Sequence, residues 1–423
     1  MSSIQETSQN SSNINTRTKK IWNIPASFVS QRTINPIRDV VFKMKVTPNP
    51  EKEYISLALG DPTHYGNLNV DENCIDAIIT QLKSHKANGY LPAVGVESAR
   101  IALAKKFSTM EAPLTPMDIV IASGASDALG LAIGALCNEG QNILLPRPGF
   151  SLYQTISESK GIECRYYNLL PDHNWEIDLD HLASLIDDNT ACLLINNPSN
   201  PCGSNFTRQH LECILNLCEI YKLPVISDEI YEDIVFGDNI FYPLANLSET
   251  VPILKISGLA KRYLVPGWRV GWIFIHDRNN LLNEIRDGLA SLANLILGAN
   301  SLIQCALPDI IMNTSQSFYD ATNMILQENA KLSASFLEKI SGLHVIVPQG
   351  AMFMMVGINV GEFKDINNDV EFSEKLVQEE SVLCLPGKSF HYPNYVRIVI
   401  TAPAEKLREA YQRINEFCVR HHV

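Results

Sequence analysis

The strongest constraint on the fold is an alternation of short apolar runs with longer helical patterns between residues 82 and 306. Helical patterns include 126–137 and 208–221. The apolar runs are DIVIAS (118–123), NILLP (142–146), IECRYYNL (162–169), ACLLIN (191–196), LPVISD (223–228), PILKIS (252–257) and VGWIFIH (270–276). Strands that alternate with helices in this way form a mostly parallel sheet with helices on both faces. The sequence therefore predicts an α/β fold around a mostly parallel, seven-stranded sheet.

A chain of 423 residues is long enough for two structural parts. After about residue 306 the pattern changes to long helices around HVIVPQGAMFMMVGI (344–358) and VRIVIT (396–401). We expect 82–306 to form a large domain, and 35–81 together with 307–423 to form a smaller α/β domain. Residues 1–34 begin with a stretch rich in Ser, Asn and Thr that lacks apolar periodicity, which predicts a disordered extension.

Composition excludes several classes of protein. The formal net charge is −12 and no basic stripe stands out, which argues against nucleic-acid binding. No uncharged apolar run approaches the roughly 18 residues that a membrane helix needs. The histidines and cysteines show no metal-ligand spacing, so no metal site is expected.

The cysteines also bear on the compartment. All ten are scattered and none forms a C-x-x-C pair, a pattern typical of reduced thiols in an intracellular protein. We therefore expect a cytoplasmic protein. A mitochondrial leader is the alternative, because Glu6 is the only acidic residue among the first 22.

Polar residues gather where the predicted strands end, which is where doubly wound sheets bind ligands. ACLLIN is followed by the amide-rich turn 197–203, and LPVISD runs into Asp228 and Tyr231. Lys261 and Arg269 follow PILKIS. DIVIAS runs into Gly-Ala-Ser at the start of a helix, and a helix N-terminus is a natural phosphate site. Together these groups are the set that pyridoxal 5′-phosphate (PLP) needs.

The chain also resembles the class I, fold-type-I PLP-dependent aminotransferases over about residues 35–420. Eight motifs in order carry this resemblance, and their joint occurrence is much more specific than any one alone. They are NPIR (35–38), LGDPT (59–63), NGYLPAVG (88–95), PRPGFSLY (146–153), NNPSNPCGSNF (196–206), SDEIY (227–231), GLAKRYLVPGWRVGW (258–272) and VRIVIT (396–401).

The resemblance implies catalytic roles for the strand-end residues. Lys261 would form a Schiff base with the PLP aldehyde and then shuttle the substrate proton, which requires a neutral amine. Asp228 would pair with the pyridinium nitrogen and keep it protonated. Tyr231 and Asn200 would hydrogen-bond the phenolic oxygen of the cofactor. Taken singly, each residue also has an ordinary structural explanation, such as a helix cap for Asp228.

Further cofactor contacts follow from the same resemblance. Phe150 would stack on the pyridine ring. Tyr90 would reach the phosphate of the neighbouring subunit, which implies a homodimer with active sites at its interface. Many members place a serine three residues before the lysine; here that residue is Gly258, and Ser257 precedes it. The expected phosphate ligands are Gly124, Ala125, Ser126, Ser257 and Arg269.

The remaining expected contacts concern the substrate. Arg397 would clamp the α-carboxylate through its planar, two-pronged guanidinium. The backbone of Gly60 would approach the same carboxylate, with Asn200 beside it. Asn35 and Arg38 would lie near the entrance of the site.

The implied reaction is a ping-pong transfer of the amino group of tyrosine, and of other aromatic amino acids, to 2-oxoglutarate. Its products are 4-hydroxyphenylpyruvate and glutamate. Alternatives on the same fold are a broad aromatic, kynurenine or alanine-type aminotransferase, or a carbon–sulfur lyase. A dinucleotide-binding oxidoreductase is disfavoured because no G-x-G-x-x-G follows the first strand. The joint presence of Lys261, Asp228 and Arg397 argues against a catalytically inactive binding protein.

Overall fold

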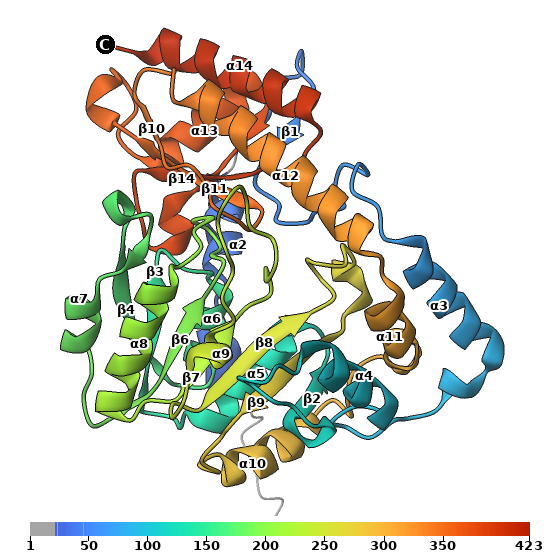
Figure 1. Cartoon of the computed structure of the whole chain (residues 1–423). Coiled ribbons are helices and arrows are strands. Elements are labelled where there is room, and N and C mark those ends of the chain that lie inside the picture. The colour runs from blue at the N-terminus through green and yellow to red at the C-terminus, as the bar shows by residue number, and fades with distance from the viewer. Residues whose placement is uncertain (1–21, 23, 45) are drawn as a thin grey trace, which may run out of the picture.

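The computed structural model describes residues 22, 24–44 and 46–423, and its largest element is an eight-stranded sheet (Figure 1). Strands β8, β7, β6, β3 and β4 are parallel, whereas β9 is antiparallel to β8 and β2, and β5 is antiparallel to β4. In spatial order the strands are β2 (Ile119–Ala122), β9 (Gly271–His276), β8 (Ile253–Gly258), β7 (Val225–Asp228), β6 (Thr190–Asn196), β3 (Asn142–Arg147), β4 (Glu163–Leu170) and β5 (Glu176–Ile177).

The prediction of a mostly parallel sheet is confirmed, but the number of strands is eight instead of seven. Each of the seven predicted apolar runs contains one strand. The additional strand, β5, has two residues and pairs with the end of β4 through Leu169 and Ile177. A strand of two residues has no alternation to detect, and its pairing depends on the turn before it, where the Trp175 amide donates to the Leu170 carbonyl.

Both faces of the sheet are buried, which explains why its strands read as continuous apolar runs. On β6, Leu193 and Leu194 are consecutive and pack in opposite hydrophobic clusters. Helices α5 (Ala125–Leu136), α6 (Leu152–Ser159) and α10 (Asn283–Ala293) cover one face. The other face carries α7 (Leu179–Ser184), α8 (Arg208–Tyr221) and α9 (Leu244–Leu247).

A smaller antiparallel sheet packs above the large one in Figure 1. Its order is β10 (Leu343–Val345), β11 (Phe353–Ile358), β14 (Tyr395–Val399) and β13 (Leu385–Pro386). Helices α12 (Gln316–Leu337), α13 (Asp369–Glu380) and α14 (Ala404–His421) pack on it. A short parallel pair, β1 (Ile55–Ser56) with β12 (Val382–Leu383), joins the N-terminal part of the chain to this domain.

The N-terminal part of the chain differs from the predicted division in one respect. Helix α2 (Pro36–Lys43) and β1 contact elements of the small domain. Helix α3 (Glu72–Ser84), however, packs beside the large sheet against α11 (Ser301–Asn313), which also packs against α4 (Glu97–Phe107). Its apolar face contributes to the same buried cluster as β2 and β9, so residues 72–81 belong with the large domain.

The predicted disordered extension also ends earlier than residue 34. A short helix, α1 (Phe28–Arg32), lies against α6. Arg32 forms an ion pair with Glu139 at 3.2 Å, and the Ile34 carbonyl accepts a hydrogen bond from Thr155 Oγ1 at 2.8 Å. The contacts that hold this segment are polar, so the sequence has no apolar periodicity from which the helix could be predicted. Residues 1–21 and 23, on which the predictions of disorder and of a leader also depend, lie outside the described residues.

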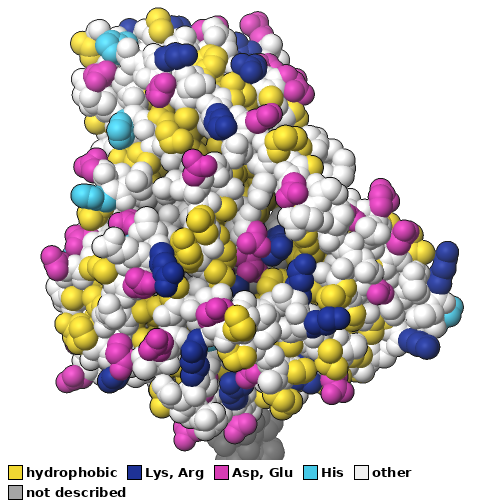
Figure 2. Space-filling view, viewed as in Figure 1, with side chains coloured by type: hydrophobic (Ala, Val, Ile, Leu, Met, Phe, Trp, Pro, Cys, Tyr) yellow, Lys and Arg dark blue, Asp and Glu magenta, His cyan; other side chains and the backbone are white. Residues whose placement is uncertain are grey.

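The surface carries both signs of charge. On the face seen in Figure 2, Lys and Arg side chains are interspersed with Asp and Glu, without a continuous basic stripe. No helix among the described residues is long and apolar enough to cross a membrane.

Candidate active site

A pocket of about 330 Å³ lies at the carboxyl ends of β6, β7 and β8, where the small domain meets the large sheet. Residues from both domains line it, and they come from positions between 37 and 397. Ten of the predicted site residues are among them: Gly60, Ala125, Ser126, Phe150, Asn200, Asp228, Tyr231, Lys261, Arg269 and Arg397.

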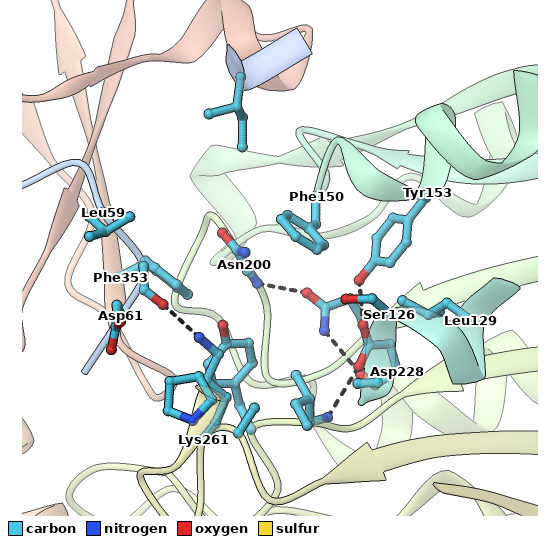
Figure 3. A pocket seen from close by; sticks show the side chains of 18 of the residues that line it. Leu59, Asp61, Ser126, Leu129, Phe150, Tyr153, Asn200, Asp228, Lys261 and Phe353 are labelled. Carbon is cyan, nitrogen blue, oxygen red and sulfur yellow. Dashed lines mark hydrogen bonds between the residues drawn. The ribbon is translucent and has the colours of Figure 1, made fainter. Parts of the chain in front are cut away.

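Lys261 extends into this pocket from the turn after β8 (Figure 3). Its Nζ donates to the Gly60 carbonyl at 2.6 Å and lies 5.9 Å from the centre of the Tyr231 ring. The pKa of Lys261 is lowered to about 8, mainly by burial; the positive charges of Arg397 and Arg269 contribute to the decrease, whereas Asp61 and Asp228 oppose it. The amine is therefore closer to its nucleophilic, neutral form at physiological pH than an ordinary lysine.

Asp228 ends β7 and is buried at the floor of the pocket. Its Oδ2 accepts a hydrogen bond from the Tyr153 hydroxyl at 2.8 Å, and its Oδ1 accepts one from the Ile230 amide at 3.2 Å. Burial raises the pKa of Asp228 to about 6, and the hydrogen bonds oppose this rise. Within the described residues no basic side chain forms an ion pair with this carboxylate, so it is suited to a cationic ligand.

Arg397 is a buried arginine on β14 whose guanidinium stacks between Phe353 and Phe390, at 4.4 and 5.1 Å from the ring centres. Its Nη2 donates to the Ala58 carbonyl at 2.6 Å, and its Nε has no hydrogen-bond partner among the described residues. No acidic side chain pairs with Arg397 in the part of the chain that the structure describes. Burial lowers the pKa of Arg397 to about 10. A buried cation of this kind is costly unless an anion accompanies it, so the geometry fits a carboxylate ligand.

Asn200 connects Arg397 to the centre of the site. Its Oδ1 accepts from Arg397 Nη1 at 2.9 Å, and its backbone amide donates to Asn196 Oδ1 at 2.7 Å. With the oxygen engaged, the side-chain NH₂ group remains as a donor. Tyr231 is buried beside it, and burial raises the pKa of this phenol, which keeps it a neutral hydrogen-bond donor.

The start of α5 has a backbone geometry that is suited to an anion. Gly124 has a φ of +81°, and a Cβ there would lie 2.6 Å from Arg269 Nη2. Glycine therefore allows the guanidinium to approach the helix N-terminus, where it donates to the carbonyls of Ser123 and Pro266. Ser126 is exposed on the first turn. Amides, a hydroxyl and a guanidinium at a helix N-terminus are suited to a phosphate.

Ser257, a predicted phosphate ligand, is not brought to the pocket. It is buried, and its hydroxyl donates to Glu232 Oε1 at 2.6 Å, in a cluster with Lys255 behind the sheet. The neighbouring Gly258 cannot be replaced by the usual serine without strain, because a Cβ there would lie 2.8 Å from the Gly271 Cα. The alternation of side chains along β8 directs Ser257 away from the cofactor side.

Three further residues that the sequence predicted for the site, Asn35, Arg38 and Tyr90, are not among the residues that line this pocket. Asn35 is the N-cap of α2, where its Oδ1 accepts from the Arg38 amide at 3.2 Å, and the Arg38 side chain is exposed. Ile37 is the α2 residue that lines the pocket. Tyr90 is 92% exposed.

Sequence reasoning missed several lining residues. Tyr153 and Asn196 fall inside two of the motifs, PRPGFSLY and NNPSNPCGSNF, so a signal was present. Ile37 and Leu59 likewise fall inside the motifs NPIR and LGDPT, whereas Phe353 lies in an apolar run that reads as ordinary core.

Comparison with known proteins identifies the class. The family model described as aminotransferase class I and II matches residues 52–414. The chain is 51% identical to tyrosine aminotransferase of Mus musculus, over 96% of this chain and 89% of that protein. It is 48% identical to tyrosine aminotransferase of Dictyostelium discoideum, over 95% and 97% of the two chains.

Solved structures agree. The chain matches a tyrosine aminotransferase from Leishmania infantum with a TM-score of 0.92 and 37% identity, covering 96% of this chain and 100% of that one. It matches an alanine aminotransferase from Pyrococcus furiosus with a TM-score of 0.88 and 28% identity, covering 94% and 100%. The chain belongs to the class I and II aminotransferases and is a PLP-dependent enzyme that acts on amino and oxo acids.

The residues of the pocket fit PLP. The corner at Gly124 is suited to its phosphate, and the buried carboxylate of Asp228 is suited to a protonated ring nitrogen. The amine of Lys261 is suited to its aldehyde. Arg397 has no acidic partner in the described part of the chain, so its guanidinium is suited to a second anion, such as a carboxylate.

The lowered pKa of Lys261 predicts its reactivity in the cofactor-free protein. Competitive labelling with acetic anhydride should reach half its maximal rate near pH 8, compared with about 10.4 for an ordinary lysine. Only the neutral amine reacts, so the labelling rate rises with pH through the pKa. Peptide mass spectrometry measures the label on Lys261, with a lysine-containing peptide as the internal standard. A midpoint for Lys261 at or above that of the standard would contradict this assignment.

Proposed function

We propose that the chain transfers the amino group of tyrosine, and of other aromatic amino acids, to 2-oxoglutarate, giving 4-hydroxyphenylpyruvate and glutamate. The observation that carries the choice of tyrosine is the 51% identity with the tyrosine aminotransferase of Mus musculus along nearly the whole chain. The acceptor follows from the family resemblance.

The proposed roles of the residues come from the family resemblance, and their positions around the pocket support them. When bound, the cofactor supplies an aldehyde and an electron-accepting ring. Lys261 Nζ holds the cofactor and, once released by the substrate amine, takes the proton from the substrate α-carbon. Asp228 keeps a proton on the ring nitrogen, and Arg397 orients the substrate through its α-carboxylate. The Tyr231 hydroxyl and the side-chain amide of Asn200 donate to the phenolic oxygen of the cofactor.

The remaining predicted contacts complete the proposed cofactor site. The phosphate would be held by the amides of Gly124 and Ala125, the Ser126 hydroxyl and Arg269, and Phe150 would stack on the ring. Their support is their position around the start of α5 and along one wall of the pocket.

The apolar part of the pocket lining supports a preference for an aromatic substrate. Ile37, Leu59 and Phe353 contribute apolar surface to the pocket. The lysine and arginines that line the described pocket are Lys261, Arg269 and Arg397, and each already has a role. No further cation in this lining is available to bind a carboxylate on the donor side chain, which an aromatic ring does not need.

We also propose that the active unit is a homodimer in which Tyr90 reaches the phosphate of the neighbouring subunit. Leu295 and Leu297 are 78% and 57% exposed, and Ile296 between them is also exposed. Gly298 lies against the Ala93 carbonyl, which places this apolar segment beside the one that carries Tyr90. Exposed apolar surface of this kind is typical of an interface. The mass of the purified chain in solution tests the proposal.

The cytoplasmic location is likewise proposed. Its support is chemical, because all ten cysteines are free thiols in the structure.

Absorbance titration of the PLP-loaded protein tests the proposed function. Tyrosine should replace the band of the lysine-bound cofactor with that of its amine form, and 2-oxoglutarate should restore the first band. Alanine and kynurenine, added in place of tyrosine, test the broader aminotransferase alternatives. Formation of the lysine-bound band without any response to tyrosine would reject the proposed substrate, and failure to form that band would reject Lys261 as the anchor.

A further inference from the structure

We propose that Tyr153 is a positioning residue whose hydroxyl holds the Asp228 carboxylate so that the shared proton stays on the ring nitrogen of the cofactor. The inference rests on the proposed role of Asp228 and adds a residue outside the direct cofactor contacts expected from the sequence. Figure 3 shows the Tyr153 hydroxyl directed at Asp228 from the helix that covers this side of the site.

Two donors from separate elements fix the carboxylate. The Tyr153 hydroxyl, on α6, donates to Oδ2 at 2.8 Å, and the Ile230 amide, in the turn after β7, donates to Oδ1 at 3.2 Å. Tyr153 is itself immobilised, since it is 1% exposed and its ring packs edge-on against Phe150, 5.7 Å between centres. Tyr153 thus contacts both Phe150, the residue expected to stack on the cofactor ring, and the Asp228 carboxylate.

The donated hydrogen bond opposes the effect of burial. Burial makes Asp228 a stronger base and raises its pKa to about 6. A hydrogen bond to the ionised form makes it a weaker base. When a ring nitrogen and this carboxylate share one proton, a weaker carboxylate base leaves more of that proton on the ring.

Tyr153 is restricted to the role of donor. Burial and the adjacent negative charge of Asp228 raise the pKa of the Tyr153 phenol well above its usual value, so it keeps its proton across the working range of the enzyme. Glu229, next in sequence to Asp228, does not compete for this bond. Its carboxylate accepts from Ser227 and from the Leu244 amide and is paired with Lys255, behind the sheet.

A second tyrosine provides a matched comparison. Tyr167 is also 1% exposed in the large domain, but its hydroxyl donates to the Leu194 carbonyl at 2.9 Å and not to an ionisable group. If both hydroxyls serve only packing, their removal should have equivalent effects. If Tyr153 acts through Asp228, only its removal should change the protonation of the cofactor ring.

The test compares Tyr153→Phe with Tyr167→Phe, each loaded with PLP labelled with ¹⁵N in the ring. The ¹⁵N chemical shift reports ring protonation independently of turnover. For Tyr153→Phe we expect a shift toward the unprotonated value and a kcat for tyrosine that is about ten- to hundredfold lower, the effect of one hydrogen bond to a charged group. KM should change little, because Arg397 is untouched. Tyr167→Phe should match the wild type in both readouts.

Identical ¹⁵N shifts in Tyr153→Phe, Tyr167→Phe and the wild type would overturn the inference. If Tyr153→Phe does not fold, 3-fluorotyrosine at position 153 replaces it. This residue is a stronger donor, so it should move the ¹⁵N shift toward the protonated value, and no movement would overturn the inference equally. Failure of the wild type to attach PLP to Lys261 is a separate result that rejects the proposed function itself.

Discussion

Replacing Lys261 with alanine is expected to abolish turnover and leave the fold intact. The side chain is partly exposed to the pocket and makes a single hydrogen bond, to the Gly60 carbonyl, so little packing is lost. Both the anchor for the cofactor and the group that moves the substrate proton disappear. The rate should therefore fall by more than about 10⁴-fold, the upper range for a general acid–base group alone. Steady-state kinetics with tyrosine and 2-oxoglutarate measure the loss, and circular dichroism checks the fold.

Two controls make this result specific to Lys261. Lys222→Ala removes an exposed lysine paired with Glu219 and should retain full activity. A small amine such as methylamine, added to Lys261→Ala, should restore part of the rate because it replaces the missing base. Near-normal turnover of Lys261→Ala without added amine would show that another group anchors the cofactor.

Replacing Arg397 with alanine is expected to weaken the binding of every substrate that carries an α-carboxylate. The guanidinium is already held between Phe353 and Phe390 and by the Ala58 carbonyl, so it is preorganised for a planar anion. Loss of hydrogen bonds to a charged group, at about 1.5–3 kcal/mol each, should raise the dissociation constants by at least about tenfold to hundredfold. Spectroscopic titration with tyrosine and with 2-oxoglutarate measures both constants.

The controls for Arg397 separate charge from geometry. Arg397→Lys keeps the positive charge but loses the planar guanidinium that can make two parallel hydrogen bonds to a carboxylate. Its affinity for the substrates should therefore lie between that of the wild type and that of Arg397→Ala. Arg420→Ala removes an arginine of the same domain that pairs with Glu379 and Glu380 outside the pocket, and should bind substrates normally. Retention of the wild-type dissociation constants by Arg397→Ala would remove this residue from the substrate site.

The sequence by itself determined the large sheet except for β5, the class of the protein and ten of the residues that line the pocket. The apolar runs that formed β2, β3, β4 and β6 to β9 are local patterns, and burial of both sheet faces makes them readable along the chain. Residues at or shortly after the ends of those strands, such as Asp228 and Lys261, meet at the carboxyl end of the sheet because β7 and β8 are parallel. The eight motifs identified the aminotransferase class, which the family model confirms.

Only the tertiary structure decided features that depend on contacts between distant segments. The two-residue strand β5, the helix α1 and the packing of α3 against the large domain have no periodicity that specifies their partners. The direction of Ser257 away from the pocket follows from its position in the pleat of β8 and from Glu232 behind it. The contact of Tyr153 with Asp228 joins residues 75 positions apart. Sequence patterns report which side chains are buried, whereas the partner of a buried hydroxyl is set by how helices and strands pack in three dimensions.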